Sequence, residues 1–222
     1  MSKTLMLNFV QNRFGFSLFL LLAVYAVGIT TVLLGHADSL MQLTVFNLLF
    51  ASGILLYNAD GLNRKYLLWF AIVAVAGYLL EVLGVLTGLV FGEYSYGTVL
   101  GWSLFNVPLI IGLNWAILVF AVAAVFAHLK MPVWAKAASA SSLMLAYDFF
   151  LEPVAIRFGF WTWAGGSIPV QNYAAWWIIA FFMLLGVFYN VSNLKNRIAI
   201  YIIVIQAIFF IVLILNQGLS IG

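Results

Sequence analysis

Seven apolar stretches, each about as long as a lipid bilayer is thick, dominate this chain of 222 residues. About 20 consecutive apolar residues span the hydrocarbon core as a helix. Only 7% of the residues are charged, against about a quarter in soluble domains, so the chain cannot cover a water-facing surface. We expect an all-α polytopic membrane protein, with residues 1–222 forming a single integral membrane domain. The predicted bundle has about seven transmembrane helices, at 14–34, 40–57, 66–90, 103–127, 133–151, 173–190 and 198–216.

The first apolar stretch is predicted to be a membrane span and not a removable signal peptide. It is long enough to cross a membrane, and no small-residue cleavage site clearly follows it before the next span. Neither disulfides nor thiolate metal sites are possible without cysteine. His36 and His128 both fall at predicted span ends without ligand spacing, so we expect no metal site.

The basic residues predict the orientation of the bundle. Only Arg157 falls on the side opposite to the others, so the positive-inside rule places the N-terminus inside and the C-terminus outside. An odd number of spans is then required, which agrees with seven. The eight basic residues expected inside are Lys3, Arg13, Arg64, Lys65, Lys130, Lys136, Lys195 and Arg197.

Two of the six acidic residues, Glu81 and Asp148, lie deep inside apolar stretches. With a helix rise of 1.5 Å per residue, both are expected about 22 Å from the inner surface, in a hydrocarbon layer roughly 30 Å thick. A carboxylate at such a depth is costly, which makes it a candidate functional group. Amides from neighbouring spans are expected near this layer or somewhat deeper, namely Asn47, Asn106, Asn114 and Asn172.

A stripe of small residues predicts which way Glu81 points. Gly77, Glu81, Gly84 and Gly88 follow one face of a helix, and small residues mark faces where another backbone approaches closely in membranes. Glu81 is therefore expected to point into the bundle. A purely structural role, in which Glu81 binds an asparagine and holds helices together, remains the alternative.

The other polar and aromatic residues carry weaker predictions. Glu152 precedes Pro153, a position biased away from helix, and is expected at the interface as an ion pair with Arg157. Glu93 is expected in an outer turn, solvated or supporting the site. Aromatic belts are common at membrane interfaces, but the outer rings also allow a hydrophobic tunnel or a cation-stabilising wall. These rings belong to Trp102, Trp161, Trp163, Tyr94, Tyr96 and Tyr173.

Three function classes can be compared on these residues. A retinal pigment needs a lysine in the middle of the last span, and 198–216 has none. A transporter would usually show internal repeats and broken helices at the midplane, and no convincing repeat occurs, although a small proton-coupled carrier stays open. An enzyme acting on a lipid-soluble substrate fits best, because a carboxyl in an apolar pocket tends to stay protonated and can protonate an alkene. Water could then add, or a ring could close.

Seven short segments between about Tyr78 and Trp177 together carry a family resemblance. They are Glu81-Val82-Leu83-Gly84-Val85-Leu86-Thr87-Gly88, Phe91-Gly92-Glu93-Tyr94-Ser95-Tyr96, Asn106-Val107-Pro108, Asn114-Trp115, Asp148-Phe149-Phe150-Leu151-Glu152-Pro153-Val154-Ala155, Trp161-Thr162-Trp163 and Pro169-Val170-Gln171-Asn172-Tyr173. These segments resemble the membrane carotenoid biosynthesis protein family, which includes carotenoid 1,2-hydratases acting on γ-carotene-type and bisanhydrobacterioruberin-type ends.

The resemblance implies hydration of the terminal ψ-end double bond of an acyclic or monocyclic carotenoid, without a cofactor. The partners expected are this polyene, water and membrane lipids, with no nucleic acid. A carotenoid cyclase or another acid-initiated isoprenoid enzyme stays open, and we expect a bacterial or archaeal cytoplasmic membrane as the host. Glu81 and Asp148 would be the acid and base in either order, supported by Asn106, Asn114, Asn172 and Glu93. The expected substrate-binding residues are Tyr78, Thr87, Tyr94, Tyr96, Trp102, Trp115, Tyr147, Trp161 and Trp163.

Overall fold

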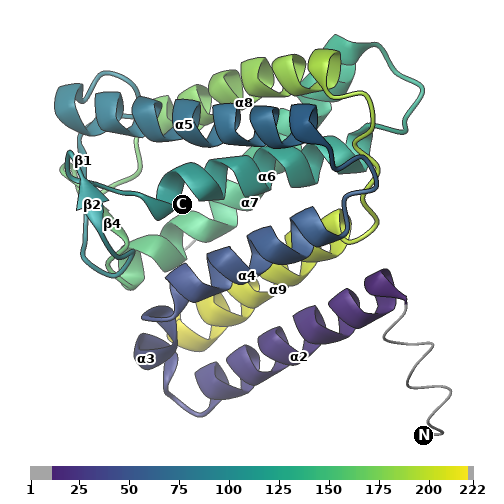
Figure 1. Cartoon of the computed structure of the whole chain (residues 1–222). Coiled ribbons are helices and arrows are strands. Elements are labelled where there is room, and N and C mark those ends of the chain that lie inside the picture. Colours follow the sequence, from purple (N-terminus) through teal and green to yellow (C-terminus); the bar gives the residue numbers. More distant parts are fainter. Residues whose placement is uncertain (1–11, 220–222) are drawn as a thin grey trace, which may run out of the picture.

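The computed structural model describes residues 12–219, which form a bundle of helices with two small two-stranded sheets at one end (Figure 1). Lys3 lies outside the described residues. The helices are α2 (Arg13–Leu33), α3 (Ala37–Met41), α4 (Thr44–Tyr57), α5 (Arg64–Thr87), α6 (Ile110–Phe126), α7 (Val133–Arg157), α8 (Val170–Asn190) and α9 (Ala199–Gln217). The strands are β1 (Tyr94–Tyr96), β2 (Ser103–Leu104), β3 (Val107–Pro108) and β4 (Trp161–Trp163).

Each of the seven predicted stretches contains a helix, which confirms the all-α class. Two of them begin differently from the prediction. Span 40–57 is divided into α3 and α4, and the Thr44 hydroxyl donates to the Met41 carbonyl at the break (2.7 Å). Span 103–127 starts with the β2–β3 hairpin, whose two loop residues, Phe105 and Asn106, both have positive φ. Such a turn matches the twist of paired strands, so the helix begins only at Ile110.

Helix α7 is longer than predicted and carries Glu152 inside it. The expectation that the helix stops before Pro153 is wrong, since α7 continues to Arg157 with Pro153 inside. The predicted interfacial pair of Glu152 with Arg157 is also wrong. Glu152 is 1% exposed, and Arg157 instead pairs with Asp38 on the surface (3.3 Å).

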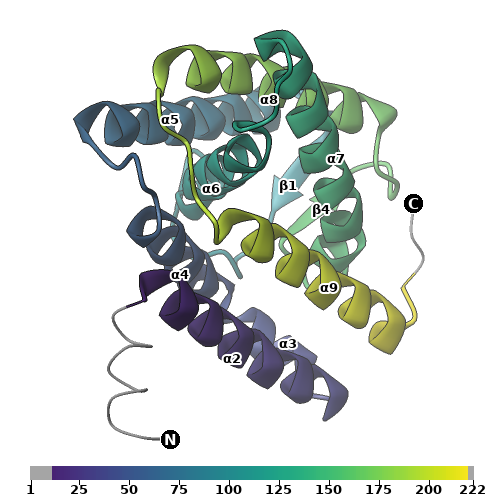
Figure 2. The same ribbon diagram turned by 90° about the vertical axis from the view of Figure 1, so that its right-hand side faces the viewer.

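Helix α6 lies at the centre of the bundle. Every residue from Trp115 to Ala123 is buried, and α6 packs against α4, α5, α7, α8 and α9. A helix that is apolar on all sides belongs in the interior. Figures 1 and 2 show α5 and α8 on one side of α6, and α2, α4 and α9 on the other. The N-terminal turns of α6 therefore place Asn114 and Trp115 deep in the molecule.

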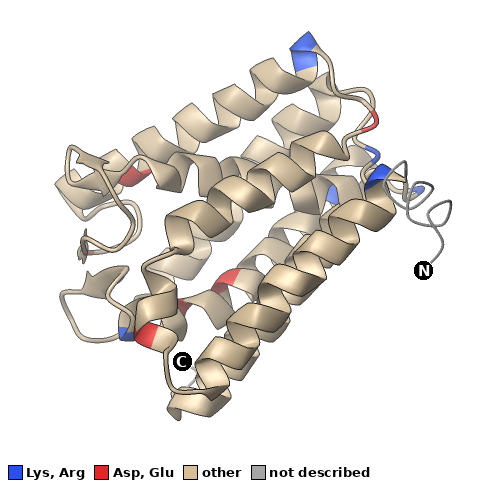
Figure 3. Ribbon diagram, turned by 60° about the horizontal axis from the view of Figure 1, so that its bottom comes forward, with Lys and Arg blue, Asp and Glu red and all other residues tan. Residues whose placement is uncertain are grey.

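Within residues 12–219, four helices are long and apolar enough to cross a membrane, namely α2, α5, α8 and α9. Helices α4 and α6 are apolar but shorter. Lys and Arg lie mostly at one end of the bundle (Figure 3), where Asp60 forms ion pairs with both Arg13 and Lys195. The seven-span topology and the N-terminus-inside orientation remain predictions.

The glycine stripe on α5 faces the interior, as predicted. Gly77, Glu81 and Gly84 are all buried, but side chains rather than a backbone pack against them: the Trp115 ring covers Gly77, and Phe91 covers Gly84. The close backbone approach occurs at Gly112 of α6 instead. A Cβ at Gly112 would lie 2.6 Å from the carbonyl oxygen of Ala74 in α5.

Replacing Gly112 with alanine should destabilise the protein. The added methyl group would force α5 and α6 apart, and overpacking of this kind costs about 1–3 kcal/mol. We expect a lower thermal unfolding midpoint for Gly112→Ala in detergent. Gly53→Ala is the matched control, because nothing lies within 4 Å of a Cβ at this helical glycine. Equal midpoints for the two variants would contradict the close packing of α5 on α6.

Candidate functional site: two carboxyl groups beneath a pair of aromatic strands

Strands β1 and β4 pair antiparallel and direct four aromatic side chains into the bundle. Tyr94 lies opposite Trp163, and Tyr96 lies opposite Trp161. Alternate residues of a strand point to the same face, so all four rings share one side of this small sheet. The rings pack across it, with centroids 5.1 Å apart for Tyr94–Trp163 and 6.1 Å for Tyr96–Trp161.

The Glu81 carboxyl accepts three hydrogen bonds from this region. Tyr94 and Tyr96 donate their hydroxyls to Oε2, at 2.5 and 2.8 Å, and the Trp115 indole donates to Oε1 at 2.9 Å. The glycine at position 77 allows Trp115 to reach Glu81, because a Cβ at Gly77 would lie 2.5 Å from the Trp115 ring. Burial raises the pKa of both tyrosine hydroxyls. The tyrosines therefore stay neutral and keep their protons.

The Glu152 carboxyl is held in a parallel way by the other strand. The Trp161 and Trp163 indoles both donate to Oε2, at 3.0 and 3.1 Å, and the Asn172 amide donates to Oε1 at 2.9 Å. An indole N–H can only donate. The oxygen that receives two of them therefore acts as an acceptor, which favours the carboxylate form of Glu152.

Asp148 lies one helical turn before Glu152, and it is fully buried. Neither of its carboxyl oxygens has a hydrogen-bond partner among residues 12–219. Glu81 and Glu152 are buried as well. The expected burial of Glu81 and Asp148 therefore agrees with the structure, and Glu152 is a third buried acid. A common depth of Glu81 and Asp148 in the membrane remains a prediction.

Glu81 and Glu152 both line one small cavity. Its volume is about 20 Å³, and a water molecule needs roughly 10–15 Å³. The cavity therefore has room for one water molecule between polar partners. Its walls are formed by Glu81, Phe91, Tyr94, Tyr96, Ile111, Asn114, Trp115, Glu152, Trp161, Trp163, Asn172 and Trp176.

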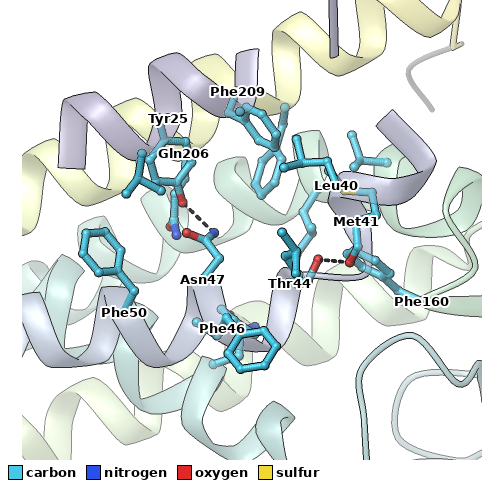
Figure 4. Close-up of a pocket in the computed structure, with 18 of the residues that line it drawn as sticks. Tyr25, Leu40, Met41, Thr44, Phe46, Asn47, Phe50, Phe160, Gln206 and Phe209 are labelled. Carbon is cyan, nitrogen blue, oxygen red and sulfur yellow. Dashed lines mark hydrogen bonds between the residues drawn. The ribbon is translucent and has the colours of Figure 1, made fainter. Parts of the chain in front are cut away.

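A much larger pocket lies beside this cavity. Its volume of about 600 Å³ falls in the range of small-molecule sites, about 300–1,000 Å³. Helices α2, α3, α4, α6, α7 and α9 line it, mostly with hydrocarbon side chains (Figure 4). Val27 of α2 and Phe46 of α4 belong to its wall and are exposed on the outer surface. The pocket thus opens between α2 and α4, toward the space that lipid tails would occupy.

The large pocket and the small cavity share part of their walls. Ile111, Asn114 and Trp161 line both. An apolar chain that enters between α2 and α4 would therefore reach the carboxyl groups past Asn114 and Trp161. This arrangement places one end of an apolar ligand beside two carboxyls and one water.

Most predicted site residues lie at these two cavities. Asn114, Asn172, Tyr94, Tyr96, Trp115, Trp161 and Trp163 line the small cavity with Glu81, and Tyr147 lines the large pocket. Asn172 binds Glu152 rather than Glu81 or Asp148.

Six predicted residues line neither cavity, and the buried Asp148 is one of them. Asn106 and Trp102 are exposed around the β2–β3 hairpin, and Tyr78 ties α5 to this hairpin by donating to the Leu104 carbonyl (2.6 Å). Glu93 is exposed between α5 and β1. Thr87 is exposed, and its hydroxyl donates to the Leu83 carbonyl within α5.

Sequence reasoning missed the role of Glu152 and two polar side chains in the wall of the large pocket, Tyr25 and Gln206. Glu152 follows Asp148 by four residues, a spacing that shares one helix face, so continuing the helix through Pro153 would have revealed it. Tyr25 and Gln206 carried no such signal, because no polar residue stands three or four positions from either of them.

Comparison with protein families gives one match. Residues 42–221 match the model of a family described as "Carotenoid biosynthesis protein". No curated protein and no solved structure matches the chain.

Proposed function

The chain belongs to the carotenoid biosynthesis protein family, and we propose that it hydrates the terminal ψ-end double bond of a carotenoid. Its role therefore lies in carotenoid biosynthesis, and its long apolar helices fit an integral membrane protein. The observation that carries the proposal is the cavity for one water molecule between Glu81 and Glu152, which adjoins an apolar pocket open toward lipid. The reaction needs these components: an acid, a base, a water and a hydrocarbon channel.

On this proposal one end of the polyene enters the large pocket while the rest stays in the membrane. The mouth of the pocket between α2 and α4 faces the lipid side. The terminal double bond then lies at Asn114 and Trp161, next to the carboxyl groups.

Glu81 is the proposed proton donor. Two of its three partners are hydroxyls, which can accept as well as donate, so Oε2 can carry a proton without leaving a partner unsatisfied. The partners of Glu152 are two indoles and an amide that all donate to it. This difference supports Glu81 as the acid and Glu152, in place of Asp148, as the base.

The proton goes to the less substituted carbon of the terminal double bond and leaves a tertiary carbocation. Its positive charge would be stabilised by the Glu152 carboxylate and by aromatic ring faces. Trp115 and Trp176 line the cavity and stack on each other, with ring centroids 4.2 Å apart. Low polarity around the site strengthens the attraction between cation and carboxylate.

Water then adds to the cation, and Glu152 takes the excess proton. One C–O bond and one C–H bond form, the π bond breaks, and the product is a tertiary alcohol. Return of the proton from Glu152 to Glu81 restores the starting state, so the reaction consumes only the alkene and water. General acid–base catalysis of this kind contributes typically about 10²–10⁴-fold.

Asp148 has a supporting part in this scheme. Its oxygens line neither cavity and have no partner among the described residues. A second negative charge beside the Glu152 carboxylate would be costly, so the proposal treats Asp148 as a neutral buried acid one helical turn from Glu152.

Expression in cells that accumulate lycopene or γ-carotene tests the function. We expect a new pigment that is heavier than its precursor by one water molecule. An isomer of unchanged mass would indicate a cyclase instead. Unchanged pigments with every acyclic carotenoid would contradict the enzyme proposal, and proton-coupled transport in pigment-free vesicles would favour the carrier.

A further inference from the structure

Four polar side chains from four different helices form two hydrogen-bonded pairs in the wall of the large pocket. Tyr147 of α7 donates its hydroxyl to Gln206 of α9 (2.9 Å), and Asn47 of α4 donates its amide to the Tyr25 hydroxyl of α2 (2.8 Å). Figure 4 shows Gln206 close to Tyr25 and Asn47, so the two pairs lie next to each other. We call these four neighbouring side chains the polar string of the pocket wall.

One hydrogen-bond acceptor in this string is available for a further donor. The Oδ1 atom of Asn47 is buried and has no partner among residues 12–219. Buried polar atoms in folded proteins nearly always have a partner. Nearby Thr44 is different, because its hydroxyl already donates to the Met41 carbonyl.

Helix packing alone does not account for Asn47. The bond from its amide nitrogen to Tyr25 is enough to hold α4 against α2, and polar bonds between membrane helices are common. The carbonyl oxygen contributes nothing to that contact. Asn47 lies in the wall of a pocket of about 600 Å³, so its unpaired oxygen is buried beside the space that a ligand would fill.

We propose that Asn47, Tyr25 and Gln206 form a subsite that binds a hydroxyl group on the inserted end of an isoprenoid ligand. A hydroxyl suits the site because it both donates and accepts, so it can pair with the amide of Asn47 and with the Tyr25 hydroxyl. None of the three residues lines the small cavity with the two glutamates. The subsite is therefore separate from the carboxyl groups. The subsite shares one assumption with the proposed function, namely that one end of a polyene enters the large pocket.

Two matched ligands that cannot themselves be hydrated test the subsite. One is lycopene with both terminal double bonds saturated, and the other is the same molecule with a tertiary hydroxyl at each end. Binding to the purified protein in detergent is followed by quenching of tryptophan fluorescence. We expect the diol to bind about two- to tenfold tighter, as one neutral hydrogen bond allows.

Variants test whether the polar string causes the tighter binding of the diol. Asn47→Leu and the nearly isosteric Tyr25→Phe should each bind both ligands equally, with an unfolding midpoint near that of the unchanged protein. Thr44→Val, which alters the same pocket without touching the string, should keep the preference.

Equal binding of the two ligands by the unchanged protein would overturn the subsite and leave the hydratase proposal standing. A preference that persists in both Asn47→Leu and Tyr25→Phe would also overturn it. Binding of neither ligand would contradict both the subsite and the entry of a polyene into the pocket.

Discussion

Glu81→Gln should abolish hydration while the protein still folds and inserts. Glutamine keeps an acceptor for the Trp115 indole and nearly the same volume, but its amide cannot give a proton to an alkene. The loss should be at least about 10²-fold, the low end for a positioned general acid. It is measured as pigment converted per amount of membrane-inserted protein.

Glu93→Gln is the matched control for this variant. Glu93 is the exposed acid between α5 and β1 and lines neither cavity, so its replacement should leave hydration nearly unchanged. Wild-type activity in Glu81→Gln would show that Glu81 has only a structural role, in which its hydrogen bonds connect α5 with α6 and β1.

Glu152→Gln should have an effect of similar size, for a different reason. The amide cannot take the proton from the adding water, and it places N–H donors against the indoles of Trp161 and Trp163. A loss of about 10²–10⁴-fold is expected, with the polyene still bound. Fluorescence quenching by a saturated lycopene separates this loss of turnover from a loss of binding.

Asp148→Asn provides the sharp contrast with both glutamate variants. Asparagine has nearly the shape of a neutral aspartic acid, and Asp148 contacts neither cavity. We therefore expect Asp148→Asn to retain far more activity than Glu81→Gln or Glu152→Gln. An equally severe loss at Asp148 would show that the reacting pair is Glu81 and Asp148, as the sequence alone suggested.

The helices could be predicted from the sequence because lipid imposes a simple rule on them. Every backbone polar group in the hydrocarbon must be paired within the segment, so long apolar stretches become helices. The prediction erred where local chemistry overrides hydropathy. Phe105 and Asn106 form a tight turn in a stretch that reads as apolar, and Gly88 ends α5 with a positive φ.

The candidate site was predictable in part. The glycine stripe gave the direction of Glu81, because Gly77 and Gly84 leave room on the same face. The pairing of β1 with β4 was not visible, since the aromatic residues of both strands also fit an interfacial belt. That pairing brings Tyr94 and Tyr96 to Glu81 and, through its other strand, supplies the donors to Glu152. A contact between segments more than 60 residues apart leaves no periodic signal in one sequence.

The most direct test of the central claim follows the atoms of water. Purified protein is incubated with lycopene in water labelled with a heavy oxygen isotope and with deuterium, and the pigments are analysed by mass spectrometry. The account predicts that each hydrated end carries one labelled oxygen and one carbon-bound deuterium, and that Glu81→Gln incorporates neither. A product without labelled oxygen, or label incorporated equally by Glu81→Gln, would contradict it.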